Sequence, residues 1–233
     1  MPGPASAIPA TRQRQETTLR YVLPFAVFIG FLALHAVAPM PPRIDFPLRV
    51  AVLAAVLLVF SRPVIDLKPR HLAASLLLGA AVFPLWIAPD TLLAHYRESW
   101  LFRNALTGVP GGALAPELRH DPWILGFRVI RAVAIVPIVE ELFWRGWLLR
   151  WLISADFRKV PLGTYTPMSF WITALMFASE HGPYWDVGLI AGVLYNWWVV
   201  RTKSLADCIL AHAVTNALLC AWVILAGRWE YWL

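Results

Sequence analysis

Seven apolar segments, bounded by charged residues or proline, follow one another along this chain of 233 residues. A helix of about 20 apolar residues crosses a bilayer, and only helices and closed barrels satisfy their backbone hydrogen bonds within lipid. The pattern therefore predicts an all-α fold, a polytopic transmembrane helix bundle with about seven spans. The expected spans cover residues 21–38, 47–61, 72–89, 123–153, 167–181, 183–200 and 204–226.

The composition excludes several classes of protein. Hydrophobic residues make up 59% of the chain and charged residues 15%, with a mean hydropathy of +0.62. A soluble domain carries roughly a quarter charged residues, so a soluble monomer, a disordered chain, a collagen and a disulfide scaffold are all excluded. The net charge of +6 does not indicate a nucleic-acid partner, because no basic run is dense enough to form a patch.

The basic residues serve instead as topology signals. Twelve Lys and Arg residues fall on the side of the predicted spans that holds the N-terminus, and eight fall on the other side. Since cytoplasmic loops carry the excess of positive charge, the tally predicts a cytoplasmic N-terminus. Trp229, Tyr231 and Trp232 would then form an interfacial aromatic belt at the opposite surface.

The first apolar segment has a second interpretation as a signal peptide. The sequence Ala36-Val37-Ala38 resembles a small-residue cleavage site. Pro39 follows directly and should hinder cleavage, and residues 21–38 are long enough to cross a bilayer. We therefore expect a retained span.

The chain is expected to divide into four parts. Residues 1–20 form a polar basic tail, 21–122 the N-terminal spans and a long loop, 123–226 a catalytic core with three motifs, and 227–233 an interfacial tail. In the long connection, roughly Asp90 to Asp121, we expect a short interfacial helix followed by a loop around Gly108–Gly112.

Charged residues within the predicted spans indicate where chemistry could occur, because each costs about 2.5–3.5 kcal/mol on insertion. Glu140, Glu141 and Arg145 lie near the middle of the longest apolar run. On a helix, Glu141 and Arg145 stand four residues apart and can pair, whereas Glu140 points about 100° away. An ion pair that only links helices would explain Glu141 and Arg145 but not the second carboxylate.

Two further spans carry polar residues at helical spacing. Phe177 and His181 lie at the end of one span, and His212 and Asn216 lie one turn apart in the last span. Each His alone is more often an interhelical hydrogen-bonding residue. Together with the carboxylates, they predict a polar site buried in the bilayer. Of the residues that flank His181, Glu180 and Asp186 either orient its imidazole or are ordinary loop charges.

These side chains are the parts of a hydrolase for amide bonds. A carboxylate beside an imidazole can activate water, and adjacent His and Asn side chains can donate hydrogen bonds to an oxyanion. No Ser or Cys is placed to act as a nucleophile with a base, so water attack without a cofactor is the simpler mechanism. A Glu/His/His set could alternatively hold zinc, although the H-E-x-x-H signature is absent.

Three ordered motifs, E-E-x-x-x-R, F-x-x-x-H and H-x-x-x-N, resemble those of the CAAX protease and bacteriocin-processing (CPBP) family of intramembrane endopeptidases. The similarity covers about residues 123–226. The sequence around the motifs resembles that of the bacterial subgroup found with exosortase and PEP-CTERM sorting systems. The motifs are Glu140-Glu141 with Arg145, Phe177 with His181, and His212 with Asn216.

The resemblance implies a glutamate-dependent rather than a metal-dependent protease. It does not supply a substrate, and some family members are known only as immunity or scaffolding proteins. The implied roles are water activation by Glu140 with His181, oxyanion stabilisation by His212 with Asn216, and orientation of the helix and tuning of Glu140 by Glu141 with Arg145.

The leading hypothesis is therefore an intramembrane endopeptidase acting on a hydrophobic or lipid-anchored peptide substrate within membrane lipid, with a link to an exosortase sorting system. The alternatives are a zinc intramembrane protease, a non-catalytic immunity or scaffold protein, and a proton-coupled transporter. One expectation conflicts with a shared site. On straight spans, His181 would lie near one membrane surface and His212 about 12 Å from the other. A kink at Pro183, a tilt or wrong span limits would remove this difference.

Overall fold

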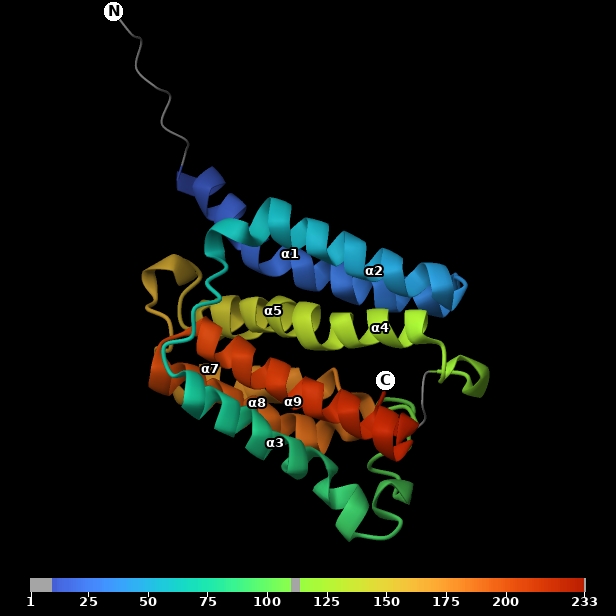
Figure 1. The fold of residues 1–233 in the computed structure, drawn as a ribbon. Coiled ribbons are helices and arrows are strands. Elements are labelled where there is room, and N and C mark those ends of the chain that lie inside the picture. Colours follow the sequence, from blue (N-terminus) through green and yellow to red (C-terminus); the bar gives the residue numbers. More distant parts are fainter. Residues whose placement is uncertain (1–9, 110–113, 233) are drawn as a thin grey trace, which may run out of the picture.

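The computed structural model describes residues 10–109 and 114–232, and the elements in these ranges are helices and turns (Figure 1). Within them the only β-type pairing is an isolated bridge between Asn104 and Gly108. The helices are α1 (Ala10–Val37), α2 (Pro42–Val56), α3 (Leu72–Leu92), α4 (Pro122–Ile130), α5 (Val136–Glu141), α6 (Leu149–Trp151), α7 (Pro167–Ser179), α8 (Trp185–Thr202) and α9 (Leu205–Ala226).

Several of these elements join into longer helices. Helices α4, α5 and α6 form one continuous helix, Pro122–Trp151, and α2 continues in the same way to Val64. Seven helical runs result in the described ranges, which confirms the predicted all-α polytopic bundle. Five of the runs in the described ranges are long and apolar enough to cross a membrane, and α7 is a shorter apolar helix.

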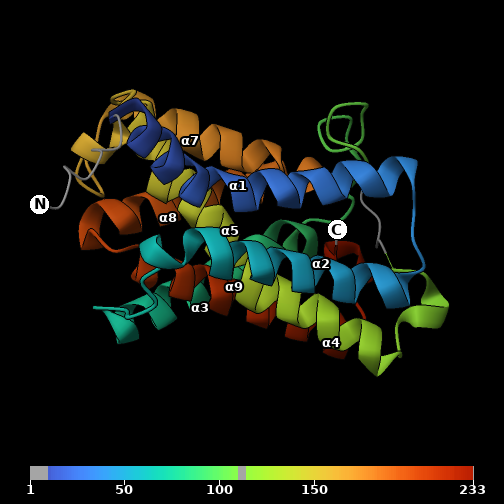
Figure 2. The ribbon, with the colours of Figure 1, turned by 90° about the horizontal axis from the view of Figure 1, so that it is seen from above.

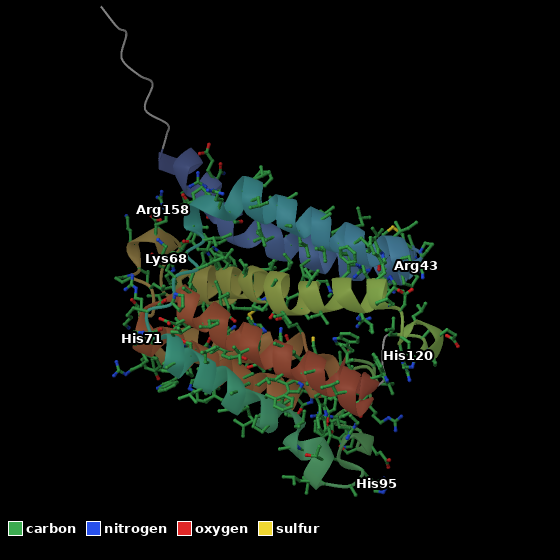
Figure 3. The ribbon with its side chains drawn as sticks, in the orientation of Figure 1. Arg43, Lys68, His71, His95, His120 and Arg158 are labelled. Carbon is green, nitrogen blue, oxygen red and sulfur yellow. The ribbon has the colours of Figure 1, made fainter. Side chains whose placement is uncertain are left out.

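The continuous helix Pro122–Trp151 lies in the middle of the bundle. Helices α1 and α2 pack on one side of it, and α9 packs on the other side together with α3, α7 and α8 (Figures 1 and 2). Charged side chains lie at the two ends of the helices. Figure 3 shows Lys68, His71 and Arg158 at one end and Arg43 and His120 at the other.

The terminal segments and the long loop differ from expectation. Helix α1 begins at Ala10, so much of the predicted tail is helical, while residues 1–9 lie outside the described part. In its described residues the long connection forms short 3₁₀ turns, and residues 110–112 of the expected loop around Gly108–Gly112 are not described. Tyr231 and Trp232 are 4% and 6% exposed, so they pack inside the bundle instead of forming an aromatic belt.

Helices α3 and α9 approach most closely at Gly79. A Cβ built there would lie 2.7 Å from the Cβ of Val214 and closer still to the carbonyl oxygen of Ala211. The hydroxyl of Thr215 donates to the Gly79 carbonyl at 2.9 Å, a bond that the same approach allows. Only glycine fits this crossing, as is common where membrane helices pack through small residues.

We predict that Gly79→Ala destabilises the protein, because the backbone of α9 cannot yield as a flexible side chain would. Overpacking costs typically about 1–3 kcal/mol. The measurement is thermal unfolding in detergent, with Gly30→Ala as the control, since a Cβ at Gly30 in α1 has nothing within 4 Å. Equal melting temperatures for the two variants would contradict the close α3–α9 contact.

Candidate functional site

A cavity of about 230 Å³ lies between α1, the central helix, α9 and the turn from α7 to α8. Glu140, His181, His212 and Asn216 line it, so the structure brings together four of the six predicted site residues. Glu141 and Arg145 are absent from the lining and are both 0% exposed. The three motifs therefore meet at one place, with one carboxylate facing the cavity and the other behind it.

Glu141 is the most fully bonded carboxylate of the site. Its Oε1 accepts hydrogen bonds from Arg145 Nη1 at 3.0 Å and from His212 Nδ1 at 2.9 Å. Its Oε2 accepts from the thiol of Cys208 at 3.1 Å. The pair expected from the four-residue spacing of Glu141 and Arg145 is present. The bond to His212 connects it to α9 and fixes the proton of that imidazole on Nδ1.

Arg145 ties the central helix to its neighbours. Its Nε donates to Asn196 Oδ1 at 2.9 Å and its Nη2 to the Gly192 carbonyl at 3.3 Å, both on α8. The guanidinium lies 4.3 Å from the ring centroid of Phe177 on α7. A buried charge is tolerated when it is paired and hydrogen-bonded, and here every side of the guanidinium has a partner.

Glu140 differs from its neighbour. Among the described residues its Oε2 is buried and has no hydrogen-bond partner, and it lies 4.0 Å from His212 Nε2. The imidazole beside Glu140 is that of His212. The reason is packing: Glu141 holds the His212 ring between the two carboxylates.

His181 presents one nitrogen to the site. Its Nδ1 lies 2.8 Å from the carbonyl oxygen of Phe177, which can only accept, so Nδ1 carries a proton and Nε2 is the basic nitrogen of the neutral ring. The ring packs against Trp86 and Phe177, with centroid distances of 5.2 and 4.7 Å. A Cβ at Gly188 would lie 3.1 Å from the imidazole, so the glycine makes room for it.

Straight spans would place His181 and His212 at different depths in the membrane, but the structure brings both to the same cavity. Helix α7 has 13 residues, which span about 20 Å, less than the roughly 30 Å of a hydrocarbon core. It ends at Ser179, and the separate helix α8 begins at Trp185, so no single span continues through a kink at Pro183. His181 lies in the turn between the two helices and reaches the cavity that His212 also lines.

Asn216 has a structural bond as well as a place in the cavity. The central helix is π-helical over Arg131–Ile135, where the N–H of Val136 donates to the Arg131 carbonyl. The next donor in that register would be Pro137, which has no N–H. Asn216 Nδ2 donates instead to the Ala132 carbonyl at 2.8 Å. Such π-helical segments are frequent at functional sites.

Sequence reasoning left the role of Glu180 open, between a residue that orients His181 and an ordinary loop charge. Glu180 lines the cavity; its Oε1 accepts from Trp144 Nε1 at 2.9 Å, and its Oε2 is buried without a partner among the described residues. Its position next to His181 was the only sequence signal. Trp144 is buried and donates to this carboxylate.

Arg97 of the long loop was missed. It donates to the Pro183 carbonyl at 2.6 Å and pairs with Asp186 at 2.7 Å and with Asp90 at 2.8 Å. The guanidinium lies 4.4 Å from the ring centroid of Tyr184. The loop therefore holds the turn that follows His181. Asp186 is engaged by Arg97 and does not orient the imidazole.

The match with known families covers the same region. Residues 122–218 match the family model described as type II CAAX prenyl endopeptidase Rce1-like. This match supports the resemblance of residues 123–226 to the CPBP family. The matched family is one of peptidases, and the several apolar helices of the described residues suit a membrane protein. No curated protein and no solved structure matches the chain.

The alternative of a zinc centre needs a cluster of ligands. Within the described residues, no group of three or more His, Cys, Asp and Glu side chains is arranged to hold a metal ion. Glu141 is already bonded to three donors, and His212 Nδ1 is bonded to Glu141. The geometry of these side chains is that of a hydrogen-bonded network.

We predict that Gly188→Ala lowers peptidase activity about 10- to 100-fold while changing the melting temperature little, because displacement of a catalytic group by about 1 Å can cost that much. The added methyl group would press on the His181 ring, which can move toward the cavity. The measurement is peptide cleavage beside thermal unfolding. Gly126→Ala is the control, since nothing lies within 4 Å of a Cβ there. Full activity in Gly188→Ala would show that the position of His181 is unimportant.

Proposed function

We propose that this protein is a glutamate-dependent intramembrane endopeptidase of the CPBP type that cleaves a hydrophobic or lipid-anchored peptide by attack of activated water. The observation that carries the proposal is the buried Oε2 of Glu140, which has no partner within the described part of the chain and lies in a cavity shared with His181, His212 and Asn216. An unsatisfied buried carboxylate oxygen is costly. A water molecule bound there would satisfy it and stand in the position of a nucleophile.

In this mechanism Glu140 accepts a proton from the water, and the resulting hydroxide attacks the carbonyl carbon of the scissile bond. The basic Nε2 of His181 helps to hold the water. The proton taken by Glu140 then passes to the nitrogen of the leaving amine as the carbon–nitrogen bond breaks. No covalent enzyme intermediate and no cofactor take part.

Two groups stabilise the oxyanion that forms. His212 donates from Nε2 in the doubly protonated form of its ring, in which Nδ1 still donates to Glu141 and keeps the ring in place. Asn216 uses one hydrogen of Nδ2 for the Ala132 carbonyl, which leaves its second hydrogen for the cavity. Donors that are fixed before the reaction need no reorganisation as the charge develops.

The proposed setting is a bacterial inner membrane with the N-terminus in the cytoplasm, which the distribution of basic residues supports. The proposed partners are membrane lipid and a hydrophobic or lipid-anchored protein substrate, with a link to an exosortase sorting system. The name of the matching family, which contains CAAX prenyl endopeptidases, supports a lipid-anchored substrate.

The proposal predicts that Glu140→Gln abolishes cleavage, because the amide keeps the shape of the side chain but removes the base. General-base catalysis contributes about 10²–10⁴ in rate. The measurement first compares membrane-protein fragments in cells that carry the intact chain or the variant. A protein that stays uncleaved in the variant cells is then incubated with purified enzyme in liposomes, and its cleavage is measured. The exposed loop variant Glu117→Gln carries the same change and should be fully active.

Chelation supplies a second arm of this experiment. Activity that survives a chelator fits the proposed mechanism, whereas stoichiometric zinc lost together with activity would favour the zinc alternative. Normal proteolysis by Glu140→Gln would contradict the role of Glu140. A biological effect that persists in proteolytically dead His181→Ala would favour a non-catalytic immunity or scaffold role.

A further inference from the structure

A second carboxylate, that of Glu180, faces the cavity beside the one that the mechanism uses. Glu180 lies at the end of α7, directly before His181, and lines the cavity together with Glu140. In the described part of the chain, each of these two glutamates has a buried Oε2 without a hydrogen-bond partner. The mechanism above gives a role to Glu140 and none to Glu180.

Trp144 holds Glu180 close to Glu140. It lies four residues after Glu140 on the central helix, so the two side chains project from adjacent turns of one face. The indole Nε1 donates to Glu180 Oε1 at 2.9 Å. This hydrogen bond fixes the Glu180 carboxyl group through one oxygen. The other oxygen, Oε2, is the one that is left without a partner among the described residues.

The two carboxyl groups of the cavity have little positive charge to share. Arg145 is bonded to Glu141 at 3.0 Å, so its charge is already paired. Two carboxylates in one buried site cannot both ionise at low cost, and one of them keeps its proton. In the state that reacts, Glu140 is the base and is ionised, with the Nε2 of His212 at 4.0 Å from its Oε2. The retained proton then lies on Glu180, whose bonded donor is a neutral indole.

The reacting groups approach the cavity from three different elements. Glu140 comes from the central helix, His212 and Asn216 come from α9, and Glu180 comes from the end of α7. In the proposed mechanism the first acts on the attacking water and the second pair acts on the oxyanion. The leaving nitrogen is a further substituent of the same carbon, so its proton donor must act from another direction. Glu180 supplies an acidic oxygen from such a direction.

We propose that Glu180 is a further catalytic residue, the acid that gives a proton to the leaving nitrogen. The inference rests on the proposed endopeptidase function and assigns a proton path to it. While Glu140 takes a proton from the water, the hydroxide oxygen bonds to the carbonyl carbon. The carbon–nitrogen bond then breaks, its electron pair stays on nitrogen, and nitrogen takes the proton of Glu180. The proton on Glu140 passes to Glu180 through a cavity water and so reaches the amine of the next turnover.

The test varies how much the leaving atom needs a proton. Three probes share the hydrophobic sequence Leu-Val-Leu-Leu-Val-Leu and carry an amide, an ester or a thioester at the central bond. Purified enzyme in liposomes hydrolyses each of them. An amine leaves only when its nitrogen is protonated, whereas a thiol has a pKa of about 8.5 and leaves as the thiolate. Loss of a proton donor should therefore slow the amide most, the ester less and the thioester least.

We expect Glu180→Gln to lower kcat for the amide about 10²–10⁴-fold, the usual contribution of a general acid or base. The loss should be smaller for the ester, kcat for the thioester should be nearly unchanged, and KM should change little. Glu180→Asp keeps an acid and should recover part of the amide activity. Glu140→Gln lacks the base that activates water and should lose all three activities alike. The matched control, exposed Glu117→Gln, should keep all three.

The outcomes separate this inference from the proposed function. Normal amide hydrolysis by Glu180→Gln overturns the inference and leaves the peptidase standing. Equal losses on the three probes also overturn it, because a residue that only positions its neighbours does not distinguish leaving groups. Retained thioester hydrolysis shows in the same experiment that the variant is folded. Wild-type enzyme that hydrolyses none of the probes refutes the proposed function, and the role of Glu180 falls with it.

Discussion

The hydrogen bonds to the Glu141 carboxylate hold the site together. Arg145 from the same helix, His212 from α9 and Cys208 from α9 all donate to it. Arg145 extends the network to α8 through Asn196, and Asn196 in turn donates to the Phe170 carbonyl on α7 at 2.8 Å. The buried ion pair of Glu141 and Arg145 is thus the centre of a hydrogen-bond network that joins the central helix, α7, α8 and α9. The cavity lies where these helices meet.

The network also explains why two adjacent glutamates have different environments. Neighbouring residues on a helix point about 100° apart, so Glu141 faces its partners and Glu140 faces the cavity. Every oxygen of Glu141 is satisfied, whereas Glu140 keeps an unpartnered oxygen among the described residues. The first carboxylate is suited to positioning and the second to chemistry. The loop that carries Arg97 extends this support to the turn of His181.

Much of the fold and part of the site follow from local sequence. Hydropathy predicts the seven helical runs because an apolar segment in a membrane must satisfy its backbone hydrogen bonds within its own helix. The four-residue spacing predicts the contact of Glu141 with Arg145. Contacts between distant segments did not follow. Three features depend on how the helices and the long loop pack: the hydrogen bond from His212 to Glu141, the position of Glu180 in the cavity, and the contacts of Arg97 with the turn after His181. No periodicity in a single sequence encodes that packing.

The most direct test of this account compares the stability of Arg145→Ala and His212→Ala. Removal of Arg145 leaves Glu141 as an uncompensated buried charge, and breaking a buried pair costs about 3–5 kcal/mol. Removal of His212 leaves the ion pair intact. We predict a clearly lower folded yield and melting temperature for Arg145→Ala than for His212→Ala. Equal yields and melting temperatures would contradict the claim that the Glu141 ion pair organises the bundle.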